Sequence, residues 1–473
     1  MLWIKERPGD DLVVRGARVV DPAQGIDAAL DVKIDKGTIT SVAETVDANG
    51  HRVVDGAGLV LAPAFVDPHV HLRTPGREDE ETLASGTAAA AAGGYCAILA
   101  MPNTDPIVDS AATLGSLADT AKREAEVHVG FLAAITRGQG GDELTEMGEL
   151  ADAGAVAFSD DGVPVVSAGM MRRALQYAST TGRPLALHCE ERTLSKGGHV
   201  HEGRVAAELG FSGYPSVAES LMVERDLSLA AYEEQPIHLL HLSAAESVAA
   251  LRRARGAGVR ASGEVTPHHL CLTDDAVRSL DSNVKMNPPL RAEKDRTALL
   301  DALRDGTIEA IATDHAPHAR YEKEVPFEAA PFGVTGLETA FAVLYTRLVA
   351  TGALPLATLL ERMSAGPARI FGLDAPRIAA GAPANLVLLD LESEWRVEEG
   401  GFRSRSQNSW LLGETLTGKV ALTVAGGAVV HEGGPGSSRS RPARSSAASR
   451  SAPTVSPRVR PSSRPAWPAT RRR

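Results

Sequence analysis

Short apolar runs alternate with segments of helical periodicity through most of the chain. Eight runs have the length and composition of buried strands, and they cover residues 59–66, 95–101, 127–133, 155–159, 184–188, 236–242, 258–265 and 308–313. Amphipathic segments fill the gaps, and the clearest are residues 80–92, 170–181, 244–255, 295–304 and 336–349. Strands that alternate with helices predict a parallel sheet, and eight such units close a (β/α)8 barrel. The pattern therefore predicts an α/β fold with a TIM-like barrel over residues 59–375.

The regions on either side of the predicted barrel alternate apolar and polar residues over short stretches, which Gly and Asp interrupt. This alternation is typical of antiparallel strands that bury one face. We expect the two regions, residues 1–58 and 376–432, to pair as one discontinuous, β-sandwich-like domain. Residues 433–473 are rich in Ser, Arg and Pro, so they cannot bury a core and are predicted to form a disordered tail.

The formal net charge of −11 hides a strongly acidic body, because residues 433–473 contain ten Arg and no Asp or Glu. Without this segment the 49 basic residues fall to 39 against 60 acidic residues, which gives a charge of −21. An acidic body argues against nucleic acid as the main partner. It also means that an anionic substrate must be attracted by local cations.

The sequence gives no sign of a membrane or secreted protein. No apolar stretch approaches the roughly 20 residues that span a bilayer, and residues 1–14 lack the apolar core of a signal peptide. The three cysteines, Cys96, Cys189 and Cys271, form no disulfide framework and fit a reducing compartment. We therefore expect a cytoplasmic protein that acts on a small molecule, with no membrane or nucleic-acid partner.

Residues that bind metals follow the ends of five apolar runs. His69 and His71 close the first run, and because residues i and i+2 of a strand share a face, both imidazoles can reach one ion. The other candidates at such positions are Asp161, His188, His241 and Asp314. Since the C-terminal ends of barrel strands meet on one face, we expect all six side chains to form a metal cluster. Imidazole and carboxylate ligands that leave a position for water are typical of catalytic zinc.

The aspartates at the strand ends have more than one interpretation. Asp160 and Asp161 precede a glycine and also suit a turn or a helix cap. Adjacent strand residues point in opposite directions, so only one of the pair is expected to be a ligand, and the two oxygens of Asp161 could bridge two ions. Asp314 could bind the metal and also carry a proton as a general acid and base.

The remaining histidines are weaker candidates. His188 and His241 could instead be hydrogen-bonded core residues, and His238 is interpreted as structural because it faces the other side of its strand. His199 and His201 lie in a long Gly-rich loop, residues 190–216, and not at a strand end, so we do not expect them to bind the metal.

Three further side chains are candidate substrate contacts. Arg73 lies two residues after His71, and its guanidinium fork suits a carboxylate. Asn103 follows the second apolar run, although a turn asparagine would give the same pattern. His318 follows Asp314 in the loop after the eighth run.

These residues identify a family. The chain resembles bacterial class I dihydroorotases of the amidohydrolase superfamily over roughly residues 10–430. The matching segments include VDPHVHLR, GGYCAILAMPNTDP, AVAFSDDGVPV, LALHCE, HLLHLS, GEVTPHHLCLTDD, VKMNPPLR, IATDHAPH and APFGVTGLETA. One departure is Thr74, which stands where the family usually has Glu; we expect its side chain to point away from the metals.

The resemblance implies a role for each candidate. It implies that His69, His71 and Asp314 hold one zinc, that His188 and His241 hold a second, and that Asp161 contacts both. It implies that Asp314 is the proton shuttle. It also implies a set of substrate-binding residues, which are His71, Arg73, Asn103, Asn287, His318 and the backbone at Phe332 and Gly333. The loop that carries the last two, residues 316–334, looks like a lid.

The function implied is that of a dihydroorotase, which cyclises N-carbamoyl-L-aspartate to L-dihydroorotate reversibly in pyrimidine biosynthesis with one or two zinc ions. One alternative is a hydantoinase or dihydropyrimidinase, whose relatives typically bridge the metals with a carboxylated lysine on strand four; this chain has no lysine between Lys122 and Lys196. The other is a non-catalytic subunit of an aspartate carbamoyltransferase complex, which would have lost metal ligands. We expect a homo-oligomer, and association with that transferase could accompany activity.

Overall fold

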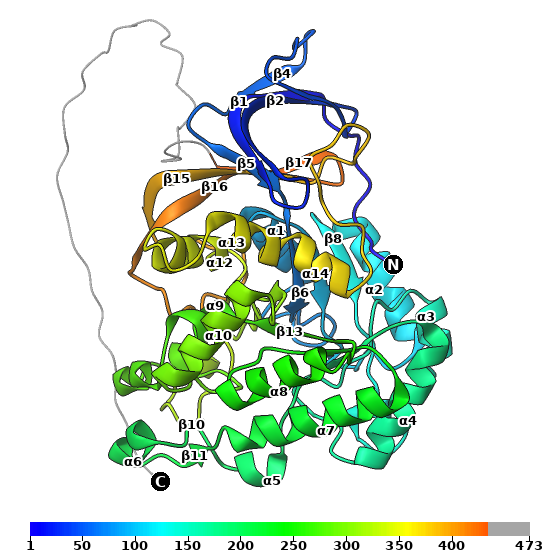
Figure 1. Cartoon of the computed structure of the whole chain (residues 1–473), viewed down its shortest axis with the longest axis vertical. Coiled ribbons are helices and arrows are strands. Elements are labelled where there is room, and N and C mark those ends of the chain that lie inside the picture. Colours follow the sequence, from blue (N-terminus) through cyan, green and yellow to red (C-terminus); the bar gives the residue numbers. More distant parts are fainter. Residues whose placement is uncertain (434–473) are drawn as a thin grey trace, which may run out of the picture. The chain divides into compact units, whose positions relative to one another are not determined.

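The computed structural model describes residues 1–433, and nearly all of the predicted tail lies outside the described residues. Two parallel sheets form the centre of the molecule (Figure 1). The first contains β6 (Phe65–Val70), β7 (Tyr95–Ala100) and β8 (His128–Phe131). The second contains β9 (Leu185–Leu187), β12 (Ile237–Leu239), β13 (Ala261–Val265) and β14 (Ala310–Ile311).

Single bridges join the two sheets into a closed ring. Phe158 pairs with Ala133 after β8 and with Leu185 in β9, and Val70 pairs with His315 after β14. All of these pairings are parallel, so the predicted barrel is confirmed. The fourth strand, expected over residues 155–159, is reduced to the bridging residue Phe158.

The first predicted strand is wrong in one respect. The apolar run 59–66 divides into two strands that belong to different sheets, β5 (Val60–Pro63) and β6. Only β6 is part of the barrel, whereas β5 pairs with strands from both ends of the chain. Because both strands are buried throughout, the run is continuously apolar and its periodicity gives no sign of the boundary.

An eight-stranded sheet flanks the barrel and contains strands from both the N-terminal and the C-terminal parts of the described chain. Its order is β17-β16-β15-β5-β1-β2-β3, with β4 beside β1. The bounds are β1 (Leu12–Asp21), β2 (Ile26–Asp35), β3 (Thr38–Ala43), β4 (Arg52–Asp55), β15 (Leu386–Arg396), β16 (Thr415–Ala425) and β17 (Ala428–Glu432). Its core is aliphatic, and Leu12, Ile34, Leu61 and Leu386 are among its buried residues. The domain boundaries near residues 58 and 376 stay a prediction.

Helices lie around the outside of the barrel (Figure 1). The longer ones are α1 (Leu83–Ala92), α2 (Ala111–Glu124), α4 (Ala168–Thr181), α7 (Val217–Glu233), α8 (Ala245–Gly256), α10 (Glu293–Asp305) and α13 (Leu356–Met363). Local sequence sets their starts: Thr82 and Ser85 form a capping box at α1, and Ser110 caps α2. The predicted helix at 336–349 forms as α12 (Ala340–Leu344) followed by a π-helical turn, η4 (Tyr345–Val349).

Shorter elements occupy the segments between these helices and strands. They are α3 (Met147–Asp152), α5 (Arg192–Ser195), β10 (Val200–His201), α6 (Arg204–Leu209), β11 (Gly213–Tyr214), α9 (Pro267–Cys271), α11 (Arg320–Lys323), α14 (Ala365–Ile370), and the 3-10 turns η1 (Arg137–Gln139), η2 (Asp274–Ser279) and η3 (Ser282–Val284). The predicted long loop 190–216 therefore contains short helices and strands of its own, and β10 pairs with β11.

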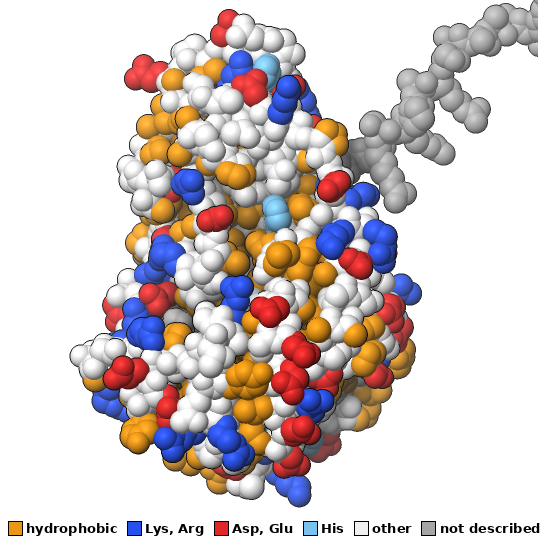
Figure 2. All heavy atoms as spheres, turned by 90° about the vertical axis from the view of Figure 1, so that its right-hand side faces the viewer, with side chains coloured by type: hydrophobic (Ala, Val, Ile, Leu, Met, Phe, Trp, Pro, Cys, Tyr) orange, Lys and Arg blue, Asp and Glu red, His pale blue; other side chains and the backbone are white. Residues whose placement is uncertain are grey.

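Acidic and basic side chains are interspersed on the face shown in Figure 2, so this face offers no continuous basic surface to nucleic acid.

Candidate metal centre

The six predicted metal ligands come together at the C-terminal end of the barrel. His69 lies near the end of β6, and the others lie on the segments that follow their strands. All six are buried, from 0% exposed for His69 to 8% for Asp314. His241 and Asp314 both have positive φ, at 32° and 48°. Non-glycine residues rarely adopt this conformation, and where it occurs it is concentrated at functional sites.

Asp161 lies at the middle of the cluster and presents one oxygen to each half. Its Oδ2 is 3.6 Å from Nε2 of both His69 and His71. Its Oδ1 is 3.6 Å from His188 Nδ1 and 3.5 Å from His241 Nε2. The first half also contains Asp314, whose Oδ1 is 3.1 Å from His71 Nε2 and 3.5 Å from His69 Nε2. A carboxylate between two groups of imidazoles is the arrangement needed to bridge two cations.

The unpaired atoms of the cluster fit a metal. His69 Nε2 is buried without a hydrogen-bond partner, and His188 Nδ1 and His241 Nε2 approach to 2.9 Å. Burial by itself lowers the pKa of His69, but Asp161 and Asp314 raise it well above its usual value, so the site stabilises positive charge at this position. A cation held by His69 would supply that charge, and His188 and His241 could hold a cation in the other half of the cluster. Nitrogen and carboxylate donors are the ligands that catalytic zinc prefers.

Both aspartates of the cluster are held in the ionised form. Burial raises the pKa of Asp314, but the charge of His69 and the hydrogen bond of His71 outweigh it and lower the pKa below the usual value. The same balance, with His69 and His241 as the main partners, lowers the pKa of Asp161 well below its usual range. The pocket therefore carries two ionised carboxylates, the form that binds a metal cation.

Two buried glutamates orient the ligands, and the sequence reasoning missed both. Glu264 accepts from Nδ1 of His69 at 2.8 Å and from Nε2 of His238 at 2.9 Å. Glu190 accepts from Nε2 of His188 at 3.0 Å. Each bond fixes which ring nitrogen faces the cluster. The available signal was an acidic residue inside an apolar run, for Glu264, or directly after one, for Glu190.

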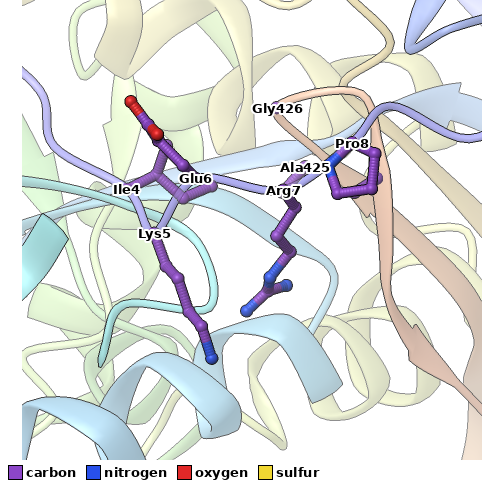
Figure 3. A pocket seen from close by; sticks show the side chains of 8 residues that line it. Ile4, Lys5, Glu6, Arg7, Pro8, Ala425 and Gly426 are labelled. Carbon is purple, nitrogen blue, oxygen red and sulfur yellow. The ribbon is translucent and has the colours of Figure 1, made fainter. Parts of the chain in front are cut away.

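The candidate substrate residues line a cavity of about 230 Å³ above the cluster, and they are His71, Arg73, Asn103, Asn287, His318, Phe332 and Gly333. A different cavity, lined by Ile4–Pro8 and residues of β16 and β17, contains neither the imidazoles nor the aspartates of the cluster (Figure 3). The chemistry of the molecule is therefore expected at the barrel end.

Arg73 is held at the cavity by a buried carboxylate. Its Nε lies 2.9 Å from Oε2 of Glu80 and donates to the carbonyl of Pro317 at 3.1 Å. Glu80 also contacts Arg77 at 2.7 Å and lies 3.5 Å from Nδ1 of His318. Within residues 1–433 the two terminal nitrogens of Arg73 donate no hydrogen bond, so they suit a ligand. The sequence analysis did not identify Glu80 as the partner of Arg73.

Asn103 and Asn287 have roles beyond the expected contact with substrate. Asn103 accepts from Nδ1 of His71 at 3.0 Å and donates to Asp161 at 3.3 Å, so it orients two of the candidate ligands. Asn287 donates to Glu190 at 3.3 Å, while its own buried oxygen has no partner in residues 1–433. His318 donates from Nε2 to the carbonyl of Phe332 at 2.8 Å.

The barrel and its histidine–aspartate cluster place the chain in the class of metal-dependent amidohydrolases. A family model described as "Dihydro-orotase-like" matches residues 58–247. The chain is 46% identical over 428 residues to the dihydroorotase of Anaeromyxobacter dehalogenans strain 2CP-C, covering 90% of this chain and 99% of that protein. It is 43% identical over 423 residues to the dihydroorotase of Geobacter metallireducens, covering 89% and 100%. The chain therefore belongs to the dihydroorotase family.

Solved structures of related enzymes share the fold. The L-hydantoinase from Arthrobacter aurescens superimposes with a TM-score of 0.81 at 26% identity, over 89% of this chain and 96% of that one. A dihydropyrimidinase from Brevibacillus agri NCHU1002 has a TM-score of 0.77 at 22% identity, over 89% of this chain and 95% of that one, and supports the fold alone.

Within residues 1–433, no helix is both long and apolar enough to cross a membrane.

Proposed function

We propose that this protein is a zinc-dependent dihydroorotase that interconverts N-carbamoyl-L-aspartate and L-dihydroorotate in pyrimidine biosynthesis. The observation that carries the proposal is the position of Asp161, with one oxygen toward His69 and His71 and the other toward His188 and His241. Identities of 43–46% to proteins named dihydroorotase, over about 90% of the chain, support the choice of substrate.

The residues of the cluster are suited to amide hydrolysis. When bound, zinc lowers the pKa of a coordinated water to about 7 and polarises a carbonyl. Water attacks the ring amide carbonyl, and the ionised Asp314 accepts its proton and passes it to the ring nitrogen that leaves. In the biosynthetic direction the carbamoyl nitrogen attacks the side-chain carboxyl carbon, Asp314 receives the proton of that nitrogen, and the proton passes to the carboxyl oxygen, which leaves as water when the C–O bond breaks. Asn103 and Glu264 hold the imidazoles in place throughout.

The substrate carboxylate would bind to Arg73. Arg73 lines a cavity that His318 and Asn287 also line, and its contacts with Glu80 and Pro317 are made through Nε. A guanidinium fork binds a carboxylate with two parallel hydrogen bonds. Because the acidic body repels an anion, this local cation would determine the preference for dihydroorotate over neutral rings.

The two alternative functions are less well supported. A hydantoinase-like bridge by a carboxylated lysine has no candidate, and Asp161 lies between the two groups of imidazoles instead. A non-catalytic subunit would be expected to have lost ligands, yet all six side chains are present and close together. We also propose one or two zinc ions per chain, a homo-oligomer in the cytoplasm, and possible association with aspartate carbamoyltransferase; light scattering with and without the transferase would test the assembly.

The decisive experiment combines metal analysis with a substrate comparison. Protein purified without chelator should contain between one and two zinc ions per chain, and it should hydrolyse dihydroorotate but barely hydrolyse hydantoin or dihydrouracil. Chelation should remove zinc and activity together, and added zinc should restore both. Equal activity on the neutral rings would reassign the protein to the hydantoinase side, and a zinc-loaded but inactive protein would favour the non-catalytic alternative.

A further inference from the structure

Two buried lysines bind the backbone of residues 327–333, a segment whose end forms one wall of the cavity. Lys285 is 2% exposed and Lys323 is 7% exposed. Lys285 Nζ donates to the carbonyls of Phe327 at 2.9 Å, Glu328 at 2.9 Å and Ala330 at 2.7 Å. A buried ammonium is costly unless its hydrogen bonds are satisfied, and here the backbone of a single segment satisfies them.

Lys323 completes the arrangement from the other side. Its Nζ donates to the carbonyls of Pro331 at 2.9 Å and Gly333 at 3.0 Å. Together the two ammonium groups bind five carbonyls within residues 327–333. The backbone of Lys285 adds a sixth contact, because its carbonyl accepts from the amide of Gly333 at 2.9 Å.

The end of this segment is part of the candidate substrate site. Phe332 and Gly333 line the cavity, and the carbonyl of Phe332 accepts from His318. Gly333 has φ +126°, and a Cβ there would lie 2.8 Å from the Cβ of Ala316 and 3.0 Å from Nε2 of His318. The wall therefore has one tightly defined conformation, and the lysines supply most of the donors that fix it.

We propose that Lys285 and Lys323 are positioning residues that fold the segment Phe327–Gly333 against the cavity and so determine substrate affinity. The inference deepens the proposed function and rests on it for the identity of the substrate. Without Lys285 three carbonyls would lose their side-chain donor, and without Lys323 the carbonyl of Pro331 would lose its donor, whereas Gly333 would keep its contact with Asn408 at 3.2 Å. Carbonyls without a donor favour an opened segment in which water satisfies them. Neither lysine touches the metal cluster, so metal binding should be independent of both.

The test replaces each lysine in the full-length protein with methionine, which keeps the length of the side chain but removes its charge. Lys294→Met is the matched control, because Lys294 is exposed and contacts only Glu246 among the described residues. Lys323→Arg retains a cation with several donors and serves as the conservative variant. Hydrogen exchange of peptides that cover 324–334 reports the segment, and steady-state kinetics with dihydroorotate report the site.

In Lys323→Met we expect exchange of the 324–334 peptides to accelerate about tenfold, while peptides from α10 keep their protection. KM for dihydroorotate should rise about tenfold, kcat should change by less than about threefold, and zinc content should stay constant. Lys323→Arg should recover part of both effects, and Lys294→Met should match the wild type. If the Lys285→Met protein folds, it should behave like Lys323→Met. If it does not fold, the comparison of Lys323→Met with Lys323→Arg tests the proposal.

Unchanged exchange and unchanged KM in Lys323→Met would overturn the proposal. So would faster exchange across the whole barrel with an equal fall in melting temperature, because that pattern would assign the lysines to general stability alone. If no variant or wild type hydrolyses dihydroorotate, yet exchange still rises only at 324–334, the proposed function fails while the role of the lysines in folding this wall stands.

Discussion

The metal end of the barrel and the flanking sheet fill their interiors with opposite kinds of side chain. The sheet buries aliphatic residues such as Ile34, Leu61 and Leu386. The metal end buries four imidazoles and two aspartates, and Glu264 and Glu190 lie directly behind them. Apolar burial stabilises a fold without specifying chemistry, whereas buried charges need particular partners. Substitutions in the sheet should therefore change stability, and substitutions at the barrel end should change metal binding and rate.

The largest effect is expected at Asp314. Asp314→Asn keeps the shape of the side chain but removes the proton acceptor, and general acid–base groups are worth about 10²- to 10⁴-fold in rate. The rate of dihydroorotate hydrolysis should fall by at least that factor while the melting temperature stays close to that of the wild type. A folded variant with more than about a tenth of wild-type activity would contradict the role of Asp314.

Arg73→Ala should cost about a hundredfold in kcat/KM for dihydroorotate, because it removes a charge-assisted, bidentate contact with the substrate carboxylate. Zinc content should stay intact, since Arg73 contacts Glu80 and Pro317 and no ligand of the cluster. Kinetics and metal analysis on the same sample test both statements. If dihydroorotate is turned over normally by this variant, its carboxylate binds elsewhere.

Glu264→Gln should weaken zinc binding about 10- to 100-fold, because the amide is a poorer acceptor for His69 and His238 than the carboxylate. Competition with a chromogenic chelator measures the change. Glu219→Gln is the matched control: Glu219 is equally buried, but it accepts from the backbone of Ser243 and Ala244 and touches no ligand. If both variants lose the same zinc affinity, the loss comes from replacing any buried glutamate with a neutral side chain and not from the orientation of His69.

Leu386→Ala tests the other side of the comparison. Leu386 is 0% exposed and pairs with Pro63 and Val424 in the centre of the flanking sheet. The substitution should lower the free energy of unfolding by about 2–5 kcal/mol. Denaturant unfolding measures this loss, whereas kcat and zinc per folded molecule should hardly change. A fall in kcat without a fall in stability would mean that the sheet acts on the site directly.

The order of apolar runs and the residue types at their ends were sufficient to predict the barrel and the six side chains that lie together at its end, whose role as metal ligands stays a prediction. Both the apolar runs and the residues at their ends are local signals. A buried strand is apolar along its whole length, and the C-terminal end of every barrel strand faces the site, whichever strands lie beside it. His69 and His71, for example, are two residues apart at the end of β6, and the alternation of side chains along a strand predicts that they share a face, although β6 itself ends at Val70. The same reasoning failed at residues 59–66, where one apolar run serves two sheets.

Only the tertiary structure decided which polar groups stand behind the ligands. Glu264 meets His69 across 195 residues of sequence, and Lys285 meets Phe327 across 42. Hydropathy records that a residue is buried but not which group it meets, because the partner comes from whichever strand or loop the fold brings alongside. The sequence by itself determined the barrel and the side chains that gather at its end, and the packing of distant segments determined how the imidazoles, Arg73 and the cavity wall are oriented.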